Sequence, residues 1–337
     1  MDSRVTELER ELPARIVVIG DLNAHATVLV RILRGLRLVT KDGRWSGGRT
    51  VLMQMGDVPN RGPGARTAME LLLALGPEAR DAGGDVLWLL GNHEVLSVLR
   101  HEAYVTPEEY MEFASTDEIE RFIYSRNRFQ LELLGLPRQR ATIPPMGGRL
   151  RAWEEENAPG REAYRAEMGP KGKLGIAIRS LPLAVRFGPL LFIHGGLSPR
   201  WAGFGLSGLD LEAKKAWAKG PEFYEDLEPS SVLRDPLGPL WHRVYALASA
   251  PSVRADLLEA LEITRARQMV IGHTRTDAVP QGEVGRVLVR HGGRLVMSDV
   301  GLGDPGEPGA ALVIERGRIE QWTPGGAKVQ VARVKSR

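Results

Sequence analysis

Five short apolar runs, each ending beside a potential metal ligand, constrain the fold of this chain more than any other feature. Each run is bounded by glycine or polar turn residues, which is typical of buried strands. The runs cover residues 15–19, 50–55, 85–90, 190–193 and 268–271. Ligands collect beyond the carboxyl ends of strands in open α/β sheets, so the polar groups at these five ends should converge on one site.

Helical patterns separate these strands and give the βαβ rhythm of an α/β fold. Residues 26–36 and 65–75 carry this pattern. The segment 101–177 breaks the rhythm, because Thr106 and Ser115 each precede acidic residues in the manner of helix starts. We therefore expect a helical insertion or lid over this segment.

The C-terminal part combines one more helix with antiparallel strands. A helix over 253–263 precedes the last of the five strands, and apolar stretches around Val287, Val296 and Val313 predict hairpins. The sequence has no internal repeat and no low-complexity linker. We expect a single domain over residues 1–337.

The composition excludes several classes of function. The 337 residues include no cysteine, which rules out disulfides, thiolate metal sites and cysteine nucleophiles. The formal net charge is only +3 and arginines alternate with acids, so we expect no nucleic-acid partner. No apolar run reaches the roughly 18 residues of a membrane span, and the N-terminus lacks the apolar core of a signal peptide. We expect a cytoplasmic protein without a membrane partner.

The residues beyond the strand ends have the chemistry of a metal centre. A metal-bound hydroxide attacks a phosphate ester, and a second metal helps to stabilise the entering and leaving oxygens. Such a centre needs a bridging carboxylate. Asp57 is the candidate bridge, Asp21 a ligand of the first metal, and Asn92, His194 and His273 the remaining ligands of the second. This mixture of oxygen and nitrogen donors suits manganese, iron or zinc better than calcium.

With these residues named, the chain resembles the calcineurin-like metallophosphoesterases of the phosphoprotein phosphatase type, and most closely the Shewanella-like protein phosphatases. The resemblance implies a β-sandwich flanked by helices. Its motifs follow in family order across roughly residues 15–320: Gly20-Asp21-Leu22, Gly56-Asp57, Arg61-Gly62, Gly91-Asn92-His93-Glu94, His194-Gly195-Gly196-Leu197-Ser198-Pro199, Gly238-Pro239-Leu240-Trp241 with Arg243, and Gly272-His273-Thr274.

The resemblance also implies roles beyond metal binding. His93 is expected to protonate the leaving oxygen, with Asn60 at the position that orients its imidazole. Arg61 and Arg243, together with Asn92, are expected to bind the substrate phosphate, because a guanidinium fork fits two phosphate oxygens. The alternative for either arginine is a surface ion pair.

Two asparagines depart from the family pattern. Asn23 stands where the family usually has a histidine ligand of the first metal, and Asn60 stands where it usually has aspartate. His25 could replace the missing ligand if residues 21, 23 and 25 alternate along an extended segment; otherwise it faces solvent in the first helical turn. Coordination by the Asn23 oxygen would favour manganese or magnesium.

The remaining polar candidates have plainer interpretations. We expect Glu94 to support the loop that carries Asn92, and Asp299 to have a structural role. His242 either touches substrate or packs in the core. His101 and His291 lie outside the motifs and are expected to be ordinary.

The sequence thus predicts a metal-dependent phosphomonoesterase, or more narrowly a protein phosphatase, which uses two divalent ions and acts on a phosphorylated protein or small molecule. Manganese is the first choice of metal, with iron, zinc or magnesium as alternatives. Two other functions stay open. One is a catalytically weak relative that binds phosphoproteins, since Asn23 and Asn60 weaken the expected chemistry. The other is a phosphodiesterase or nucleotide hydrolase on the same scaffold.

Overall fold

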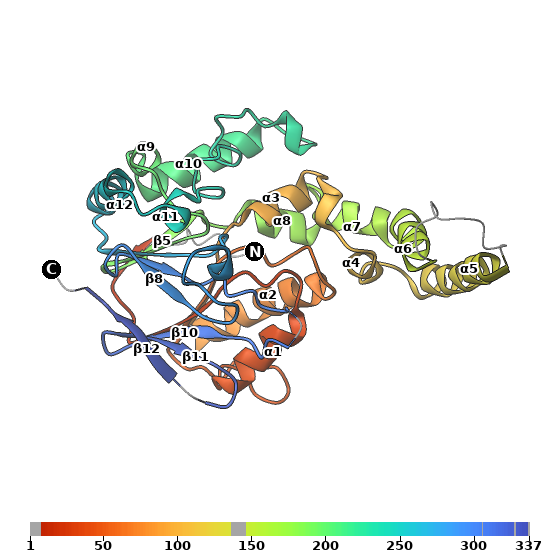
Figure 1. The fold of residues 1–337 in the computed structure, drawn as a ribbon, viewed down its shortest axis with the longest axis horizontal. Helices are drawn as coiled ribbons and strands as arrows, with labels where there is room; N and C mark the ends of the chain where they lie inside the picture. The colour runs from red at the N-terminus through yellow and green to blue at the C-terminus, as the bar shows by residue number, and fades with distance from the viewer. Residues whose placement is uncertain (1–7, 136–145, 305, 327, 336–337) are drawn as a thin grey trace.

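The computed structural model describes residues 8–135, 146–304, 306–326 and 328–335. Two six-stranded mixed sheets lie at the centre of the molecule, with helices around them and a helical arm that extends to one side (Figure 1). Apolar residues of both sheets belong to one continuous buried core. The expectation of an α/β sandwich flanked by helices is confirmed.

The first sheet combines three strands from the N-terminal part of the chain with its last three strands. Its order is β12-β11-β10-β2-β3-β4, and β2, β3 and β4 run parallel while the other pairs are antiparallel. The strands are β2 Arg15–Ile19, β3 Val51–Gln54, β4 Asp85–Trp88, β10 Ala311–Glu315, β11 Arg318–Trp322 and β12 Lys328–Arg333.

The second sheet is also mixed. Its order is β1-β5-β6-β7-β9-β8, in which β6, β7 and β9 run parallel. The strands are β1 Glu9–Arg10, β5 Ala184–Phe187, β6 Leu190–Ile193, β7 Gln268–Ile271, β8 Leu288–Arg290 and β9 Leu295–Met297. The C-terminal hairpins predicted from sequence are therefore present as β8–β9 and β10–β11.

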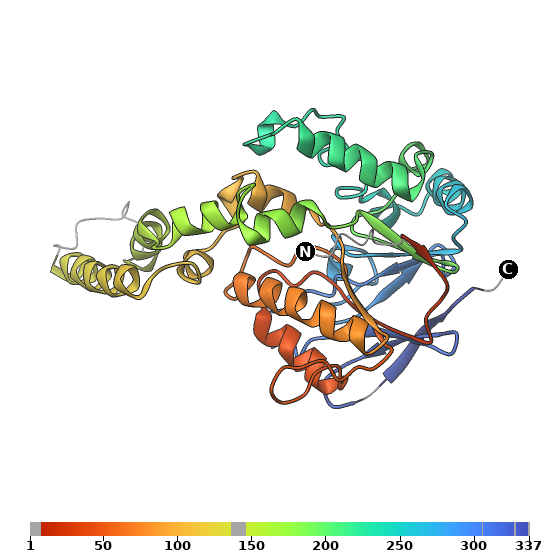
Figure 2. The same ribbon diagram turned by 180° about the vertical axis from the view of Figure 1, so that it is seen from behind.

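Helices cover the outer sides of the sheets. Helices α1 (Ala26–Gly35) and α2 (Ala65–Asp81) lie beside the first sheet (Figure 2). The predicted end of α2 at residue 75 is wrong, because the helix continues through Pro77. Its last turns keep Gly76 and Ala79 buried, and this packing outweighs the lost backbone donor of the proline.

A second group of helices flanks the other sheet and the edge of the site. It comprises α3 Asn92–Val98, α8 Lys173–Arg179, α9 Pro199–Ala202, α10 Gly205–Ala218, α11 Val244–Leu247 and α12 Pro251–Ile263. None of the helices in the described part of the chain is both long and apolar enough to cross a membrane.

The described residues of the segment 101–177 are largely helical, and most of them form the arm of Figure 1. Its main helices are α4 Pro107–Met111, α5 Thr116–Gly135, α6 Met146–Asn157 and α7 Arg161–Met168. Both predicted helix starts are present: the Thr106 hydroxyl accepts a hydrogen bond from the Glu109 amide at 3.2 Å, and Ser115 pairs with Glu118 in the same way. That the whole chain is one domain stays a prediction.

Candidate functional site

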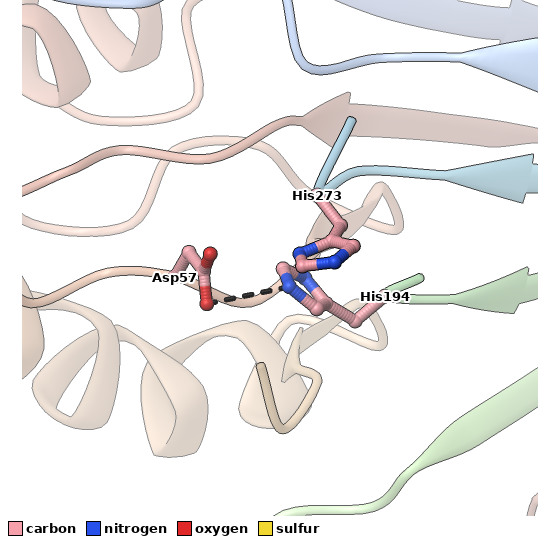
Figure 3. A group of neighbouring side chains, drawn as sticks. All are labelled: Asp57, His194 and His273. Atoms are coloured by element: carbon pink, nitrogen blue, oxygen red, sulfur yellow. Dashed lines mark ion pairs between the residues drawn. The ribbon is translucent and has the colours of Figure 1, made fainter. Parts of the chain in front are cut away.

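The strands of the two sheets bring three candidate metal ligands together at their carboxyl ends. Asp57 follows β3, Asn92 begins α3 after β4, and His194 follows β6 of the other sheet. The His194 Nε2 atom lies 3.0 Å from Asn92 Oδ1. It also lies 3.3 Å from Asp57 Oδ1 (Figure 3). All three side chains are buried.

The hydrogen bonding of His194 shows why a cation fits this cluster. Its Nδ1 lies 2.8 Å from the Met55 carbonyl oxygen, which can only accept a hydrogen bond, so Nδ1 carries the proton. In the neutral ring, Nε2 then presents a lone pair to two oxygen atoms that also present lone pairs. A metal ion satisfies three such atoms at once, and the backbone hydrogen bond on the far nitrogen is typical of histidine ligands.

His273, which follows β7, completes this cluster. It is buried, and its Nε2 has no hydrogen-bond partner among the described residues. Its ring centroid lies 5.0 Å from that of His194. Within the described ranges, Asp57, His194 and His273 are the one group of three acidic or histidine side chains whose ligand atoms lie within 4.8 Å of one another (Figure 3).

The electrostatics of the cluster also favour a positive charge. Burial disfavours the charged form of His194, but attraction to Asp57 outweighs burial and raises the pKa of His194 to about 10. Burial likewise opposes ionisation of Asp57, yet His194 and His93 hold the pKa of this carboxyl well below its usual range. The protein alone therefore stabilises a cation between these groups, which is the role of a metal ion.

The backbone around the cluster is strained and close-packed. Asp57, Asn60, Arg61 and His273 have φ values of 56°, 72°, 69° and 60°. Such left-handed conformations cost about 1–3 kcal/mol each and concentrate at functional sites. At Gly56, with φ 96°, a Cβ atom would lie 2.7 Å from the His194 ring, so only glycine allows the ligand loops to approach this closely.

Glu94 supports the ligand loops, as expected from the sequence. Its carboxylate accepts hydrogen bonds from the amides of Asp57 (2.9 Å), Val58 (2.7 Å) and Gly91 (2.9 Å), and from the Trp88 indole (3.2 Å). Burial raises the pKa of Glu94 to about 7. The buried Trp88 thus also takes part in this network.

The candidate ligands of the first metal are less complete. Asp21 is buried and accepts the His273 amide hydrogen bond with both oxygens, at 3.0 and 3.1 Å. Burial, followed by the charges of Asp299 and Asp57, raises its pKa well above the usual range. A cation beside Asp21 would reverse this shift. Asp299 is itself buried, and burial raises its pKa to about 6.

The structure does not bring His25 into the cluster. Its Nδ1 lies 3.0 Å from the Leu22 carbonyl oxygen, and a Cβ atom at Gly62 or Gly303 would clash with its ring. The Asn23 Oδ1 lies 3.5 Å from the Arg61 Nη1. The roles of Asn23 and His25 toward a metal stay predictions.

His93 and Asn60 form the expected pair beside the metal ligands. His93 Nδ1 lies 2.9 Å from Asn60 Oδ1, and His93 Nε2 lies 3.9 Å from Asp57 Oδ2. Burial is the largest cause that lowers the pKa of His93, to about 4, and the positive charges of Arg61 and His194 act in the same direction. The pair therefore holds a histidine whose second nitrogen faces the cluster.

The two arginines differ in their surroundings. Arg61 is exposed, makes no ion pair with any described residue, and stacks on the Tyr104 ring at 5.2 Å. Arg243 is half-buried and donates to the His273 carbonyl at 2.8 Å and to Thr274 at 3.2 Å. Neither has the surface ion pair that was the alternative to phosphate binding.

Aromatic rings form a continuous arc along the edge of the cluster, which the sequence did not reveal. Neighbouring rings lie 5.0–6.1 Å apart between centroids. In order, the arc runs through His273, Trp241, Tyr224, His101, Tyr104 and His93. It joins the metal cluster to the candidate acid, and no spacing rule in the sequence links its members.

The other histidines lie outside the cluster. His242 is buried against Tyr245, with ring centroids 4.2 Å apart, and burial lowers its pKa to about 4. His291 Nε2 lies 2.7 Å from the Tyr245 carbonyl oxygen. For His242 the packing interpretation agrees with this environment. His101, expected to be ordinary, lies instead in the aromatic arc.

A family model described as calcineurin-like phosphoesterase matches residues 14–275. The chain belongs to this family. The match contains every candidate ligand and both candidate phosphate-binding arginines, and members of the family hydrolyse phosphate esters with divalent metal ions. The chain is accordingly a metal-dependent phosphatase, and the resemblance found in the sequence is confirmed.

Curated relatives carry the same resemblance. The chain is 28% identical over 281 residues to Shewanella-like protein phosphatase 2 of Arabidopsis thaliana, covering 82% of this chain and 70% of the relative. It is 23% identical to Shewanella-like protein phosphatase 1 of Plasmodium berghei, covering 82% of this chain and 65% of that relative.

Solved structures confirm the fold. A cold-active protein-tyrosine phosphatase of a psychrophilic Shewanella species superposes with a TM-score of 0.70 at 21% identity, covering 97% of this chain and 83% of the other. A second structure of a cold-active protein tyrosine phosphatase gives a TM-score of 0.71 at 20% identity, covering 97% and 81%.

Proposed function

We propose that this metal-dependent phosphatase hydrolyses phosphate monoesters on proteins at the cluster of Asp57, Asn92, His194 and His273. The observation that carries the proposal is the convergence of lone-pair atoms on His194 Nε2, at 3.0 and 3.3 Å. A divalent metal, when bound, supplies the Lewis acid that activates water and offsets phosphate charge.

Side chains of the protein would bind the phosphate and protonate the leaving group. Arg61 and Arg243 would hold the phosphate oxygens through their guanidinium groups. His93 would donate the proton on Nε2 to the leaving oxygen while Nδ1 keeps its hydrogen bond to Asn60. Asn92 would contact the phosphate as well as the metal.

The aromatic arc supports a phosphotyrosyl substrate. Tyr104 lies beside both His93 and Arg61, so the leaving group would pass next to its ring. Flat aromatic groups gain about 0.5–1.5 kcal/mol from offset or edge contacts with such rings. The solved structures with this fold that are named protein-tyrosine phosphatases agree with a phosphotyrosyl substrate, and the relatives named as protein phosphatases agree with a phosphoprotein.

The choice of metal is inferred from the ligand atoms that the protein offers. Four ligands with two imidazoles fit manganese, iron or zinc, and we place manganese first because Asn23 would add an oxygen to a second, harder site around Asp21. Two ions and a cytoplasmic location remain proposals. The weak phosphoprotein-binding alternative keeps its basis in Asn23 and Asn60.

The test compares phosphotyrosyl and phosphoseryl peptides of the same sequence with manganese present. We expect faster hydrolysis of the phosphotyrosyl peptide, and loss of that preference in Tyr104→Leu. The matched control is Tyr124→Leu, which removes a tyrosine that is 72% exposed on α5. Equal rates on the two peptides, unchanged by Tyr104→Leu, would contradict the substrate proposal.

A further inference from the structure

The carboxyl group of Glu109, on helix α4 of the arm, lies next to the candidate catalytic residues. Glu109 on α4 is fully buried, and its Oε1 accepts hydrogen bonds from the Asn60 backbone amide and from Asn60 Nδ2, both at 3.3 Å. Asn60 Nδ2 also donates to Ser97 Oγ at 3.2 Å. Asn60 in turn contacts His93. A chain of contacts therefore leads from the arm to the candidate acid.

We propose that Glu109 is a positioning residue for His93, acting through the side chain of Asn60. The inference rests on the proposed function, in which His93 protonates the leaving group. Glu109 would not touch substrate. It would fix which end of the Asn60 side-chain amide faces the His93 imidazole. This orientation in turn sets the tautomer of neutral His93, that is, which ring nitrogen is protonated.

The argument starts from the two ends of an asparagine side chain, which is a donor at Nδ2 and an acceptor at Oδ1. Glu109 Oε1 and Ser97 Oγ lie on the Nδ2 side, and both accept from it. The acceptor Oδ1 must then face His93 Nδ1 at 2.9 Å. A flipped amide would turn its donors toward the imidazole and its oxygen toward the carboxyl of Glu109.

This orientation decides the chemistry of His93. Oδ1 can only accept, so Nδ1 of His93 carries the proton that stays, and Nε2 faces Asp57 Oδ2 at 3.9 Å. When His93 is doubly protonated, Nε2 gives its proton to the leaving oxygen as the bond from phosphorus to that oxygen breaks. His93 then returns to the neutral form with its proton on Nδ1. A wrongly oriented Asn60 would stabilise the other tautomer, whose Nδ1 cannot be a donor.

Glu109 carries a cost in stability that only one of its oxygens offsets. It is 0% exposed and its Oε2 has no hydrogen-bond partner among the described residues. An unsatisfied buried polar group costs about 1–3 kcal/mol. Its Oε1 accepts from the buried backbone amide of Asn60, which leucine would leave without this acceptor, so the carboxyl group at 109 serves Asn60.

The pairing also explains why asparagine replaces the family's aspartate. A carboxylate at position 60 would face Glu109 Oε1 across the 3.3 Å now spanned by an N–H donor. Two buried carboxyl groups at this distance cannot both be charged, so one of them would have to keep a proton. The side-chain amide of Asn60 therefore complements the carboxyl group of Glu109 as a hydrogen-bond donor. Aspartate, the family's residue, fits position 60 only if residue 109 donates a hydrogen bond to it.

The first experiment uses leaving groups of different acidity. A misplaced acid slows esters of weakly acidic alcohols more than esters of p-nitrophenol, because the latter leave with little help. We expect Glu109→Leu to lower kcat about 10-fold or more on an alkyl phosphate but under about 3-fold on p-nitrophenyl phosphate. Glu109→Gln, which keeps an acceptor, should stay within about 3-fold on both. Glu108→Gln, at the neighbouring exposed acid, is the control.

The second experiment exchanges the donor and the acceptor. Asn60→Asp alone should lower kcat on the alkyl phosphate, and N60D/E109Q should recover most of it, since the amide introduced at 109 can donate to the carboxylate introduced at 60. Metal content should be the same in all variants. The coupling would be refuted if the relative kcat of N60D/E109Q, compared with the unmodified protein, equalled the product of the relative kcat values of the two single variants.

A third measurement does not depend on turnover. In zinc-loaded protein with ¹⁵N-labelled histidine, the His93 signal, assigned with His93→Gln, should show a proton on Nδ1 in the unmodified chain and a mixture of tautomers in Glu109→Leu. The same tautomer in both proteins would overturn the proposal. If the unmodified protein hydrolyses nothing, the proposed function fails, and this signal still tests the positioning separately.

Discussion

Replacing Glu109 by glutamine should change how the stability of the protein depends on pH. Burial raises the pKa of Glu109 from its ordinary 4.5 to about 8. Between these two values the unfolded chain releases the proton and the folded chain keeps it. The unfolded state then binds fewer protons, so the free energy of unfolding falls as pH rises.

The size of this effect follows from the shift. Each pH unit between about 5 and 8 costs the folded state about 1.4 kcal/mol, which gives about 4 kcal/mol over the whole window. Relaxation around a buried carboxyl reduces such values, so a change of about 2–4 kcal/mol is a realistic range. Glu109→Gln cannot ionise and should not show this loss.

Urea unfolding at pH 5 and pH 8 measures the effect. The advantage of Glu109→Gln over the unmodified protein should grow by about 2–4 kcal/mol from pH 5 to pH 8. Glu108→Gln should show no such growth, because the Glu108 side chain is 44% exposed and its hydrogen bond to Arg151 helps to outweigh partial burial and lower its pKa. Parallel pH dependence of the unmodified protein and Glu109→Gln would refute the burial argument.

Three further substitutions test the site. Arg61→Ala should lower kcat/KM about 10- to 100-fold with a melting temperature close to that of the unmodified protein, since Arg61 is exposed; a large thermal loss with full activity would show a structural role. His194→Ala should remove most of the bound metal in elemental analysis, and unchanged metal content would exclude His194 as a ligand. Asn23→His should raise the affinity for the more weakly bound ion about 10-fold, measured by metal titration, and no change would place residue 23 outside the metal site.

Much of the fold follows from local sequence signals. The runs before Asp21, His194 and His273 predict β2, β6 and β7 to the residue, because short buried strands between turn residues leave little freedom. The runs at 50–55 and 85–90 are longer than β3 and β4, because the apolar residues Met55, Leu89 and Leu90 are buried like strand residues but follow the last paired residues of the strands.

The partners of the candidate acid could not be predicted in the same way. Glu109 looks in sequence like any acidic residue in the first turn of a helix, and its separation of 49 residues from Asn60 carries no signal. Its position depends on how the arm packs against the ligand loops. The aromatic arc has the same origin, because Tyr104, Tyr224 and Trp241 come from separate segments. Non-local packing, rather than local pattern, sets these contacts.

The most direct test of the central claim is hydrolysis of p-nitrophenyl phosphate by the unmodified protein across a manganese titration, beside Asp57→Asn. Asp57 lies 3.3 Å from His194 and is the only carboxylate in the described cluster of three. We predict that activity of the unmodified protein rises with bound manganese and that Asp57→Asn loses at least about 100-fold at every concentration. If the two proteins hydrolyse the ester equally at all metal concentrations, the cluster is not the catalytic centre.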